Sequence, residues 1–194
     1  MSIETPVQWL KGLGDLLLDT RCKVEGEGVS LDDAYKTIAD IFINLREREG
    51  TLWWVGNGGS ASICTHLSQD VLNKLQLRSM HFCDPSLITC MANDFGYAES
   101  FRKPLSMQAK AGDALIAISS SGNSDNIIAC GKQAAEMGME LITLSAFEET
   151  NKLYNLPAEV SMYLPTSLYG LAEVGHEALI HAAIECVWLQ ENQN

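Results

Sequence analysis

The sequence predicts an α/β protein, built as a three-layer αβα sandwich around a five-stranded parallel sheet. Short apolar runs alternate along the chain with longer segments that carry apolar residues at helical spacing. Two of these runs end in glycine-rich or serine-rich turns that lead directly into a helical pattern. Strands separated by helices form parallel sheets covered on both faces, and such sheets bind ligands at the carboxyl ends of their strands.

Each element is expected from its own pattern. Two extra helices precede the core at 4–20 and 31–48, with Gly26 and Gly28 marking the break between them. Apolar runs predict strands at 52–55, 114–118, 140–144 and 160–164, with a further strand-like run at 80–82. Helices are expected after the first two of those strands, to about Leu75 and Met137, and at 170–190.

Composition limits the number of domains and the kind of partner. A chain of 194 residues, 46% hydrophobic, is long enough for one substantial core and short for two domains. The net charge of −12, with only 13 lysines and arginines, argues against a nucleic-acid partner. A small anionic ligand remains possible, because backbone N–H groups can hold a phosphate inside an acidic protein.

The cysteines and the apolar segments predict a cytoplasmic protein without a membrane partner. No signal peptide or bilayer-spanning apolar stretch is evident in the sequence. The cysteines lie far apart, form no CxxC pair and are expected to be free and buried. They are Cys22, Cys64, Cys83, Cys90, Cys130 and Cys186.

The first turn that follows a strand, at residues 56–60, carries three glycines and a serine. It would leave backbone N–H groups exposed beside the positive end of a helix dipole, which favours an anion. The turn lacks the Walker lysine and is not a GxGxxG sequence, and a glycine turn here is often purely structural. This turn alone therefore indicates an anion site only weakly.

The second turn supplies hydroxyl groups at an equivalent strand end, on Ser119, Ser120, Ser121 and Ser124. Hydroxyls donate hydrogen bonds to phosphate oxygens without a counter-charge. The alternative is that these serines only cap the following helix. Two such turns at neighbouring strand ends predict a phosphate site.

With these turns, the sequence resembles the sedoheptulose 7-phosphate isomerases within the SIS family, whose fold is flavodoxin-like. The resemblance runs from about residue 5 to 190 and implies a single SIS domain over 1–194, with an αβα core at 51–190. It rests on three segments in this order: Gly56-Asn57-Gly58-Gly59-Ser60, Ala92-Asn93-Asp94-Phe95-Gly96 and Ile118-Ser119-Ser120-Ser121-Gly122-Asn123-Ser124.

The resemblance implies how a sugar phosphate would be held. The phosphate would be bound by Ser60, Ser119, Ser121 and Ser124, and Lys74 falls where the family usually has an arginine. A lysine keeps the charge but loses the planar fork of arginine. Without the resemblance, Lys74 could equally be a solvated helix residue. The other implied substrate-binding residues are Asn57, Gly58, Gly59, Asn93, Asp94, Ser120 and Glu173.

The chemistry-bearing side chains lie on two helices. His66 and Asp70 are four residues apart and share one helix face, and Glu173 and His181 lie roughly on one stripe of the closing helix. Their imidazoles and carboxylates suit either acid–base chemistry or a zinc-like metal, and the residues alone do not decide between these. His176 and His81 could simply be packing residues.

The resemblance implies roles for these groups. Asp70 and His181 would be the catalytic base and acid, and one zinc ion could be bound by His66, Asp70, Glu173 and His181, with no nucleotide cofactor. Asp70 replaces the usual glutamate, which withdraws the carboxylate by roughly 1.5 Å. Glu173 replaces a glutamine and adds a charge, and Gly170 stands where the family often has an aspartate.

The implied reaction is aldose–ketose isomerisation through an enediol, with sedoheptulose 7-phosphate converted to D-glycero-D-manno-heptose 7-phosphate for surface polysaccharide. The alternatives are an isomerase of another phosphosugar and a non-catalytic SIS protein that binds a phosphosugar as a regulator. The resemblance also implies a homo-oligomer, a tetramer, in which residues 1–50 provide helices for packing between subunits.

Overall fold

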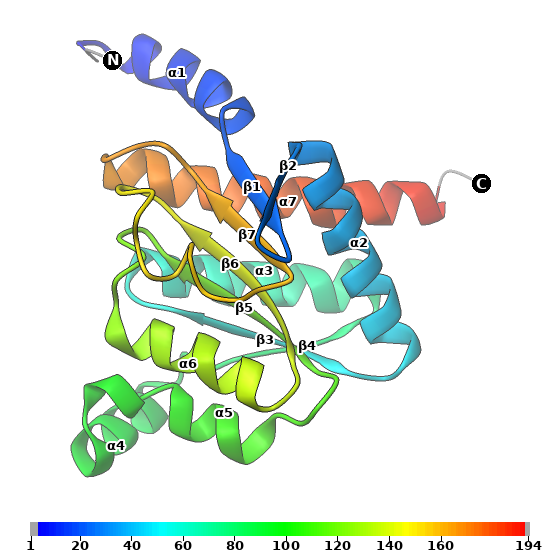
Figure 1. Cartoon of the computed structure of the whole chain (residues 1–194), viewed down its shortest axis with the longest axis vertical. Helices are drawn as coiled ribbons and strands as arrows, with labels where there is room; N and C mark the ends of the chain where they lie inside the picture. The colour runs from blue at the N-terminus through cyan, green and yellow to red at the C-terminus, as the bar shows by residue number, and fades with distance from the viewer. Residues whose placement is uncertain (1–3, 193–194) are drawn as a thin grey trace.

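The computed structural model describes residues 4–192 and shows a seven-stranded sheet in the order β2-β1-β7-β6-β5-β3-β4 (Figure 1). Its last five strands are all parallel, as the sequence predicts. These are β7 (Val160–Tyr163), β6 (Glu140–Ser145), β5 (Ala114–Ser119), β3 (Thr51–Gly56) and β4 (Arg78–His81). The predicted α/β class and parallel core are confirmed.

The prediction of only five strands is wrong, because a hairpin extends the sheet. Strands β1 (Arg21–Val24) and β2 (Glu27–Val29) pair with each other antiparallel, and β1 also pairs antiparallel with β7. Glu25 and Gly26 both adopt positive φ, which suits a two-residue hairpin turn. Strands of four and three residues are too short for their alternation to stand out in the sequence, so the sequence predicts this segment only as a break between helices.

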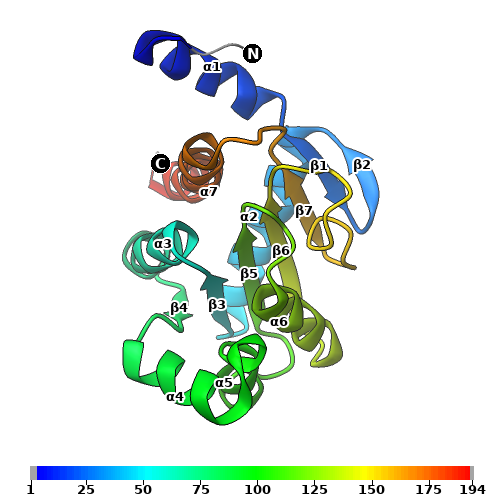
Figure 2. The ribbon, with the colours of Figure 1, turned by 90° about the vertical axis from the view of Figure 1, so that its left-hand side faces the viewer.

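Helices cover both faces of the sheet (Figure 2). One face packs against α2 (Leu31–Glu47), α3 (Gly59–Leu75) and α7 (Tyr169–Asn192), and the other packs against α5 (Arg102–Gln108) and α6 (Asp125–Glu136). Successive residues of β3 point to opposite faces of the sheet. Trp54 packs in the core on the face covered by α2, α3 and α7, and Trp53 packs in the core on the face covered by α5 and α6. The predicted three-layer arrangement is therefore present.

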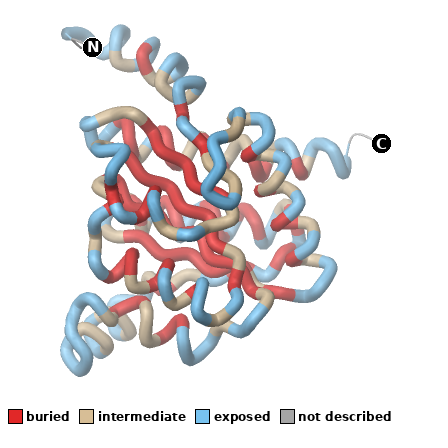
Figure 3. The backbone as a smooth tube through the Cα atoms, viewed as in Figure 1, coloured by how far each residue is buried: buried red, intermediate tan, exposed pale blue. Residues whose placement is uncertain are grey.

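Two helices project from this body, α1 (Pro6–Leu18) and α4 (Pro85–Phe95) (Figures 1 and 3). Helix α1 buries only Gly12, α4 buries no residue, and α4 leads into the short 3₁₀ helix η1 (Tyr97–Glu99). Val7 and Leu10 of α1 are 59% and 63% exposed. Leu16 and Leu17 pack against the core of the monomer, but that core does not account for Val7 and Leu10.

All six cysteines are free, as expected, but their burial varies. Cys22, Cys64 and Cys130 are buried, and Cys83 is half-buried. The expected burial is wrong for Cys90 and Cys186, which are exposed. Cys90 lies on α4, where Leu87 and Ile88 are only partly buried against the core, so the apolar residues near that cysteine in sequence do not bury it. Between residues 4 and 192, none of the helices has the length and apolar character to cross a membrane.

Candidate active site

The turns after β3 and β5 meet at one edge of the sheet, because these strands are parallel neighbours. Their side chains, with two residues at the start of α7, enclose a small cavity of about 140 Å³. Its polar lining consists of Asn57, Ser60, Ser119, Ser120, Ser121, Ser124, Tyr169 and Glu173. The serines that the sequence assigns to phosphate binding therefore converge on one pocket.

Two helices begin at this pocket without a side-chain cap. Gly58, before α3, has φ 54° and ψ −121°, a conformation that favours glycine and leaves no side chain to cap the helix. Ser124 occupies the N-cap position of α6, yet its hydroxyl makes no capping hydrogen bond. The alternative that Ser124 only caps the helix is therefore wrong. Both helix ends present N–H groups without an intrahelical partner, which together with the dipoles favour an anion.

Two hydroxyl groups of the second turn lie within hydrogen-bond distance of each other at the wall of the pocket. Ser119 Oγ lies 3.3 Å from Ser124 Oγ, and Ser60, Ser119 and Ser120 are buried. Gly122 has φ 62°, and a Cβ there would lie 1.9 Å from Asn151 Oδ1, so glycine is required for the turn to fold this way. The pocket thus combines hydroxyl donors with helix N-termini, which is the chemistry of a phosphate site.

The acid–base residues also come together. Asp70 and His66 project from the same face of α3, and His181 approaches them from α7. His181 Nδ1 lies 3.7 Å from Asp70 Oδ2, and the rings of His66 and His181 have centroids 5.2 Å apart. The Asp70 side chain is 13% exposed and that of His181 is 32% exposed. His66 is exposed, so the cluster is buried on the side of Asp70 and open to a ligand on the side of His66.

The same three residues form a candidate metal site. One ligand atom from each of His66, Asp70 and His181 lies within 4.8 Å of the others. Zinc ligands at about 2.0–2.2 Å from the ion stand roughly 3–4 Å apart, so small side-chain rotations bring these donors into range. Two imidazoles and one carboxylate are ligands that zinc accepts. The residues fit a metal with at least one position open for a ligand.

Glu173 is not part of that cluster. It lines the serine-rich pocket instead, and its carboxylate lies against Gly59, where a Cβ would meet Glu173 Oε1 at 2.3 Å. Gly59 is the first residue of α3, so the carboxylate sits at the positive end of that helix. The structure thus supports Glu173 as a pocket residue and does not bring it to the proposed metal ligands.

Three other predicted residues lie outside the pocket. Lys74 is one turn beyond Asp70 and forms an ion pair with Glu185 of α7, which raises the pKa of the lysine. Asn93 and Asp94 lie exposed near the end of α4, where Asn93 Nδ2 donates to Asp94 Oδ1 over 2.8 Å. Gly58 and Gly59 contribute backbone at the start of α3. The assignments of Lys74, Asn93 and Asp94 to the substrate remain predictions.

His176 packs in the core and is not a ligand. It is fully buried, its Nε2 lies 3.1 Å from the carbonyl oxygen of Ser145, and burial lowers the pKa of His176 to about 4. The neutral ring therefore donates from Nε2. Tyr169 also lines the pocket, and its ring packs edge-on against Phe147 with the ring centroids 4.8 Å apart. No sequence pattern marked that tyrosine.

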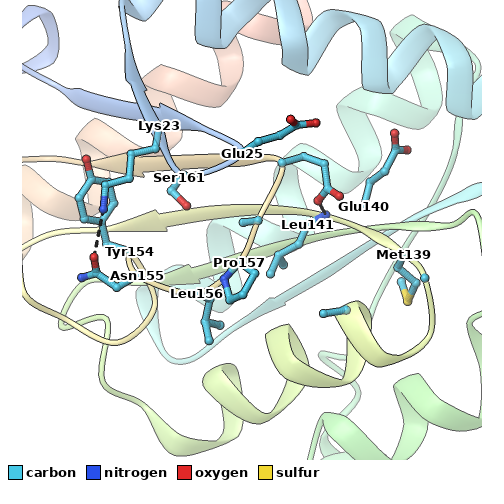
Figure 4. Close-up of a pocket in the computed structure, with 15 residues that line it drawn as sticks. Lys23, Glu25, Met139, Glu140, Leu141, Tyr154, Asn155, Leu156, Pro157 and Ser161 are labelled. Atoms are coloured by element: carbon cyan, nitrogen blue, oxygen red, sulfur yellow. Dashed lines mark hydrogen bonds between the residues drawn. The ribbon is translucent and has the colours of Figure 1, made fainter.

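A separate cavity of about 710 Å³ opens near the amino end of β6, away from this site (Figure 4). Lys23 lies over the ring of Tyr154 at 3.9 Å and donates to Asn155 over 3.0 Å. Its lining contains no histidine and no serine-rich turn. The larger cavity contains carboxylates such as Glu25, Glu140 and Glu159, but it lacks the histidine and the serine-lined helix N-termini that the smaller site combines.

Comparison with known proteins agrees with this geometry. The family described as SIS domain matches residues 29–146. The chain is 33% identical over 153 residues to the phosphoheptose isomerase of Cytophaga hutchinsonii, covering 75% of this chain and 78% of that one. It is 29% identical over 175 residues to that of Neisseria meningitidis serogroup C, covering 86% and 88%. The solved phosphoheptose isomerase of Neisseria gonorrhoeae superposes with a TM-score of 0.75 at 29% identity, covering 81% and 87%.

The fold and the site define a protein built as a SIS domain, with a serine-lined pocket at the carboxyl edge of its sheet. The chain belongs to the SIS family, and within it to the phosphoheptose isomerases.

Proposed function

We propose that the protein is a cytoplasmic aldose–ketose isomerase that converts sedoheptulose 7-phosphate to D-glycero-D-manno-heptose 7-phosphate, a step toward surface polysaccharide. One observation carries the proposal. The uncapped N-termini of α3 and α6 meet at one serine-lined pocket, and helix α7 carries both a residue of that pocket, Glu173, and His181, which lies beside Asp70. Relatives named phosphoheptose isomerase, similar over most of the chain, support the choice of sugar. The cytoplasmic location follows from the substrate class, since sugar phosphates are intracellular metabolites.

The phosphate is held by Ser60, Ser119, Ser121 and Ser124 together with the N-termini of α3 and α6. From Glu173 in the pocket to His181 in the cluster, α7 rises by eight residues, or about 12 Å. An open-chain sugar phosphate can span that distance with its phosphate at one end and its carbonyl at the other. Anchoring the phosphate therefore orients the reacting carbons.

The chemistry is a proton transfer between neighbouring carbons. Asp70 removes the proton next to the carbonyl, an enediol forms, and Asp70 returns the proton to the adjacent carbon. His181, 3.7 Å away, donates a proton to the carbonyl oxygen and accepts one from the hydroxyl oxygen that becomes the new carbonyl. No electrons leave the sugar overall, so the reaction needs no nucleotide cofactor.

We also propose that His66, Asp70 and His181 can hold a zinc ion, because their donor atoms fit one. A bound zinc ion would polarise the oxygens of the substrate as a Lewis acid. Glu173 could join this set only by leaving its place against Gly59. Metal analysis of the purified protein tests this assignment.

The proposal includes a homotetramer. The exposed apolar residues of α1, with Val7 and Leu10, suit burial between subunits within residues 1–50. Analytical ultracentrifugation tests it, and a monomer at micromolar concentration would contradict it.

The activity is tested by incubating the protein with sedoheptulose 7-phosphate in D₂O and following the products by NMR. The proposal predicts a heptose 7-phosphate product and deuterium at C1 or C2. Turnover of a different phosphosugar alone would favour the broader isomerase alternative. Binding without turnover or deuterium uptake, for every phosphosugar tried, would favour the regulatory alternative.

A further inference from the structure

The side chain of Asn57 is held by the protein on both of its polar atoms. Asn57 Nδ2 donates to Asn126 Oδ1 over 2.9 Å, and Asn126 Nδ2 donates back to Asn57 Oδ1 over 2.9 Å. Asn126 is 2% exposed and lies in the first turn of α6. This reciprocal amide pair joins the turn after β3 to the helix that follows the turn after β5.

A third residue completes the connection. Tyr97, in η1, donates its hydroxyl to Asn57 Oδ1 over 2.9 Å. The side-chain oxygen of Asn57, Oδ1, therefore accepts two hydrogen bonds, one from Asn126 and one from Tyr97. Tyr97 directly follows the segment that carries Asn93 and Asp94, so the network also fixes that segment relative to the pocket.

We infer that Asn126 and Tyr97 are positioning residues for the phosphate pocket and that they act through Asn57. This inference deepens the proposed function and rests on it for the identity of the ligand. It assigns Asn57 to holding the two turns at a fixed separation, in place of the sugar contact that the resemblance implies.

The physical reason lies in the backbone around Asn57. Gly58 and Gly59 follow it directly, and glycines leave the direction of the N–H groups at the start of α3 poorly determined on their own. Anchoring the Asn57 side chain to α6 fixes that direction, so both helix N-termini point into the same pocket. Preorganised donors of this kind bind an anion without a loss of loop entropy on binding.

The sharpest probe is Tyr97→Phe, because it removes one hydrogen bond from a residue that is 58% exposed. The fold should tolerate this change without a shift in melting temperature. We expect KM for the sugar phosphate to rise roughly three- to tenfold, the usual effect of one net hydrogen bond, with kcat within about twofold. Tyr35→Phe, on α2, is the matched control and should leave KM unchanged.

Asn126→Ala gives the second arm of the test. We expect a larger effect of roughly tens of fold on KM, because Asn57 loses both of its hydrogen bonds to the Asn126 amide and keeps only the one from Tyr97. Adding Tyr97→Phe to Asn126→Ala should have a smaller effect than Tyr97→Phe alone, since both act through one side chain. Additive effects would overturn the inference. So would a Tyr97→Phe variant with unchanged KM.

Binding of inorganic phosphate, followed by ³¹P NMR titration, separates this inference from the proposed function because it needs no turnover. Weaker phosphate binding in both variants supports the network even if no sugar phosphate is isomerised by the wild type. Equal phosphate binding in wild type and variants overturns the network even if isomerase activity is found. A wild type that binds no phosphate would overturn both.

Discussion

Replacing Glu173 by glutamine tests whether the negative charge of this side chain weakens the binding of a phosphate in the pocket. Glu173 lines the pocket, and its carboxylate lies against Gly59 at the start of α3. That carboxylate is favoured by the helix dipole, but it opposes a phosphate in the same cavity. Glutamine has the same shape without the charge, so the change removes the repulsion and little else.

The size of the effect follows from the cavity. A phosphate centred in about 140 Å³ lies roughly 5 Å from a carboxylate on the wall, and Coulomb's law then gives about 1–2 kcal/mol for a dianion at a dielectric constant near that of water. A lower effective dielectric would enlarge this value. We therefore expect the glutamine variant to bind the sugar phosphate roughly five- to thirtyfold more tightly.

The assay is KM for sedoheptulose 7-phosphate together with the dissociation constant of inorganic phosphate, at low and high salt. Salt should narrow the difference from wild type, because part of the repulsion is screened. Glu47→Gln, at the exposed end of α2, is the control for a general change in net charge. Unchanged or weaker phosphate binding by Glu173→Gln would refute the electrostatic reasoning and would favour Glu173 as a ligand contact.

Further substitutions test the remaining parts of the site. His181→Ala should lower kcat by roughly 10²–10⁴ while the fold is kept, and full activity in this variant would show that the catalytic assignment is wrong. Ser124→Ala should raise KM yet leave the free energy of unfolding within about 0.5 kcal/mol, whereas a capping serine would cost about 1 kcal/mol by denaturant titration. His176, with its pKa lowered to about 4, binds a proton more weakly folded than unfolded, so its contribution to stability is complete above about pH 6.5 and is lost as pH falls toward 4. Between pH 6.5 and 4, the free energy of unfolding of His176→Gln should therefore fall by up to about 3 kcal/mol less than that of the wild type. If the unfolding free energies of the two proteins ran parallel with pH, this reasoning would be wrong.

The parallel core and the phosphate turns could be predicted from sequence because their signals are local. The apolar run of β3 ends directly in Gly56-Asn57-Gly58-Gly59-Ser60, and the structure brings this turn beside the serines after β5. The helical spacing of His66 and Asp70 placed both on one face of α3. Only the contact of this face with His181 required the tertiary structure.

The missed features depend on contacts between distant segments. The β1–β2 hairpin is stabilised by pairing with β7, some 140 residues later in the chain, so its short strands carry little signal of their own. The partnership of Asn57 with Asn126 spans two turns and cannot be read from either one. The position of Glu173 against Gly59 likewise depends on how α7 packs on α3, which helical spacing alone leaves undetermined.

The most direct test of the account is a crystal structure of Asp70→Asn with sedoheptulose 7-phosphate bound. We predict the phosphate among Ser60, Ser119, Ser121 and Ser124, with C1 and C2 of the sugar between residue 70 and His181. A phosphate bound elsewhere, such as beside Lys23 in the cavity near β6, or a sugar whose carbonyl end points away from His181, would contradict it.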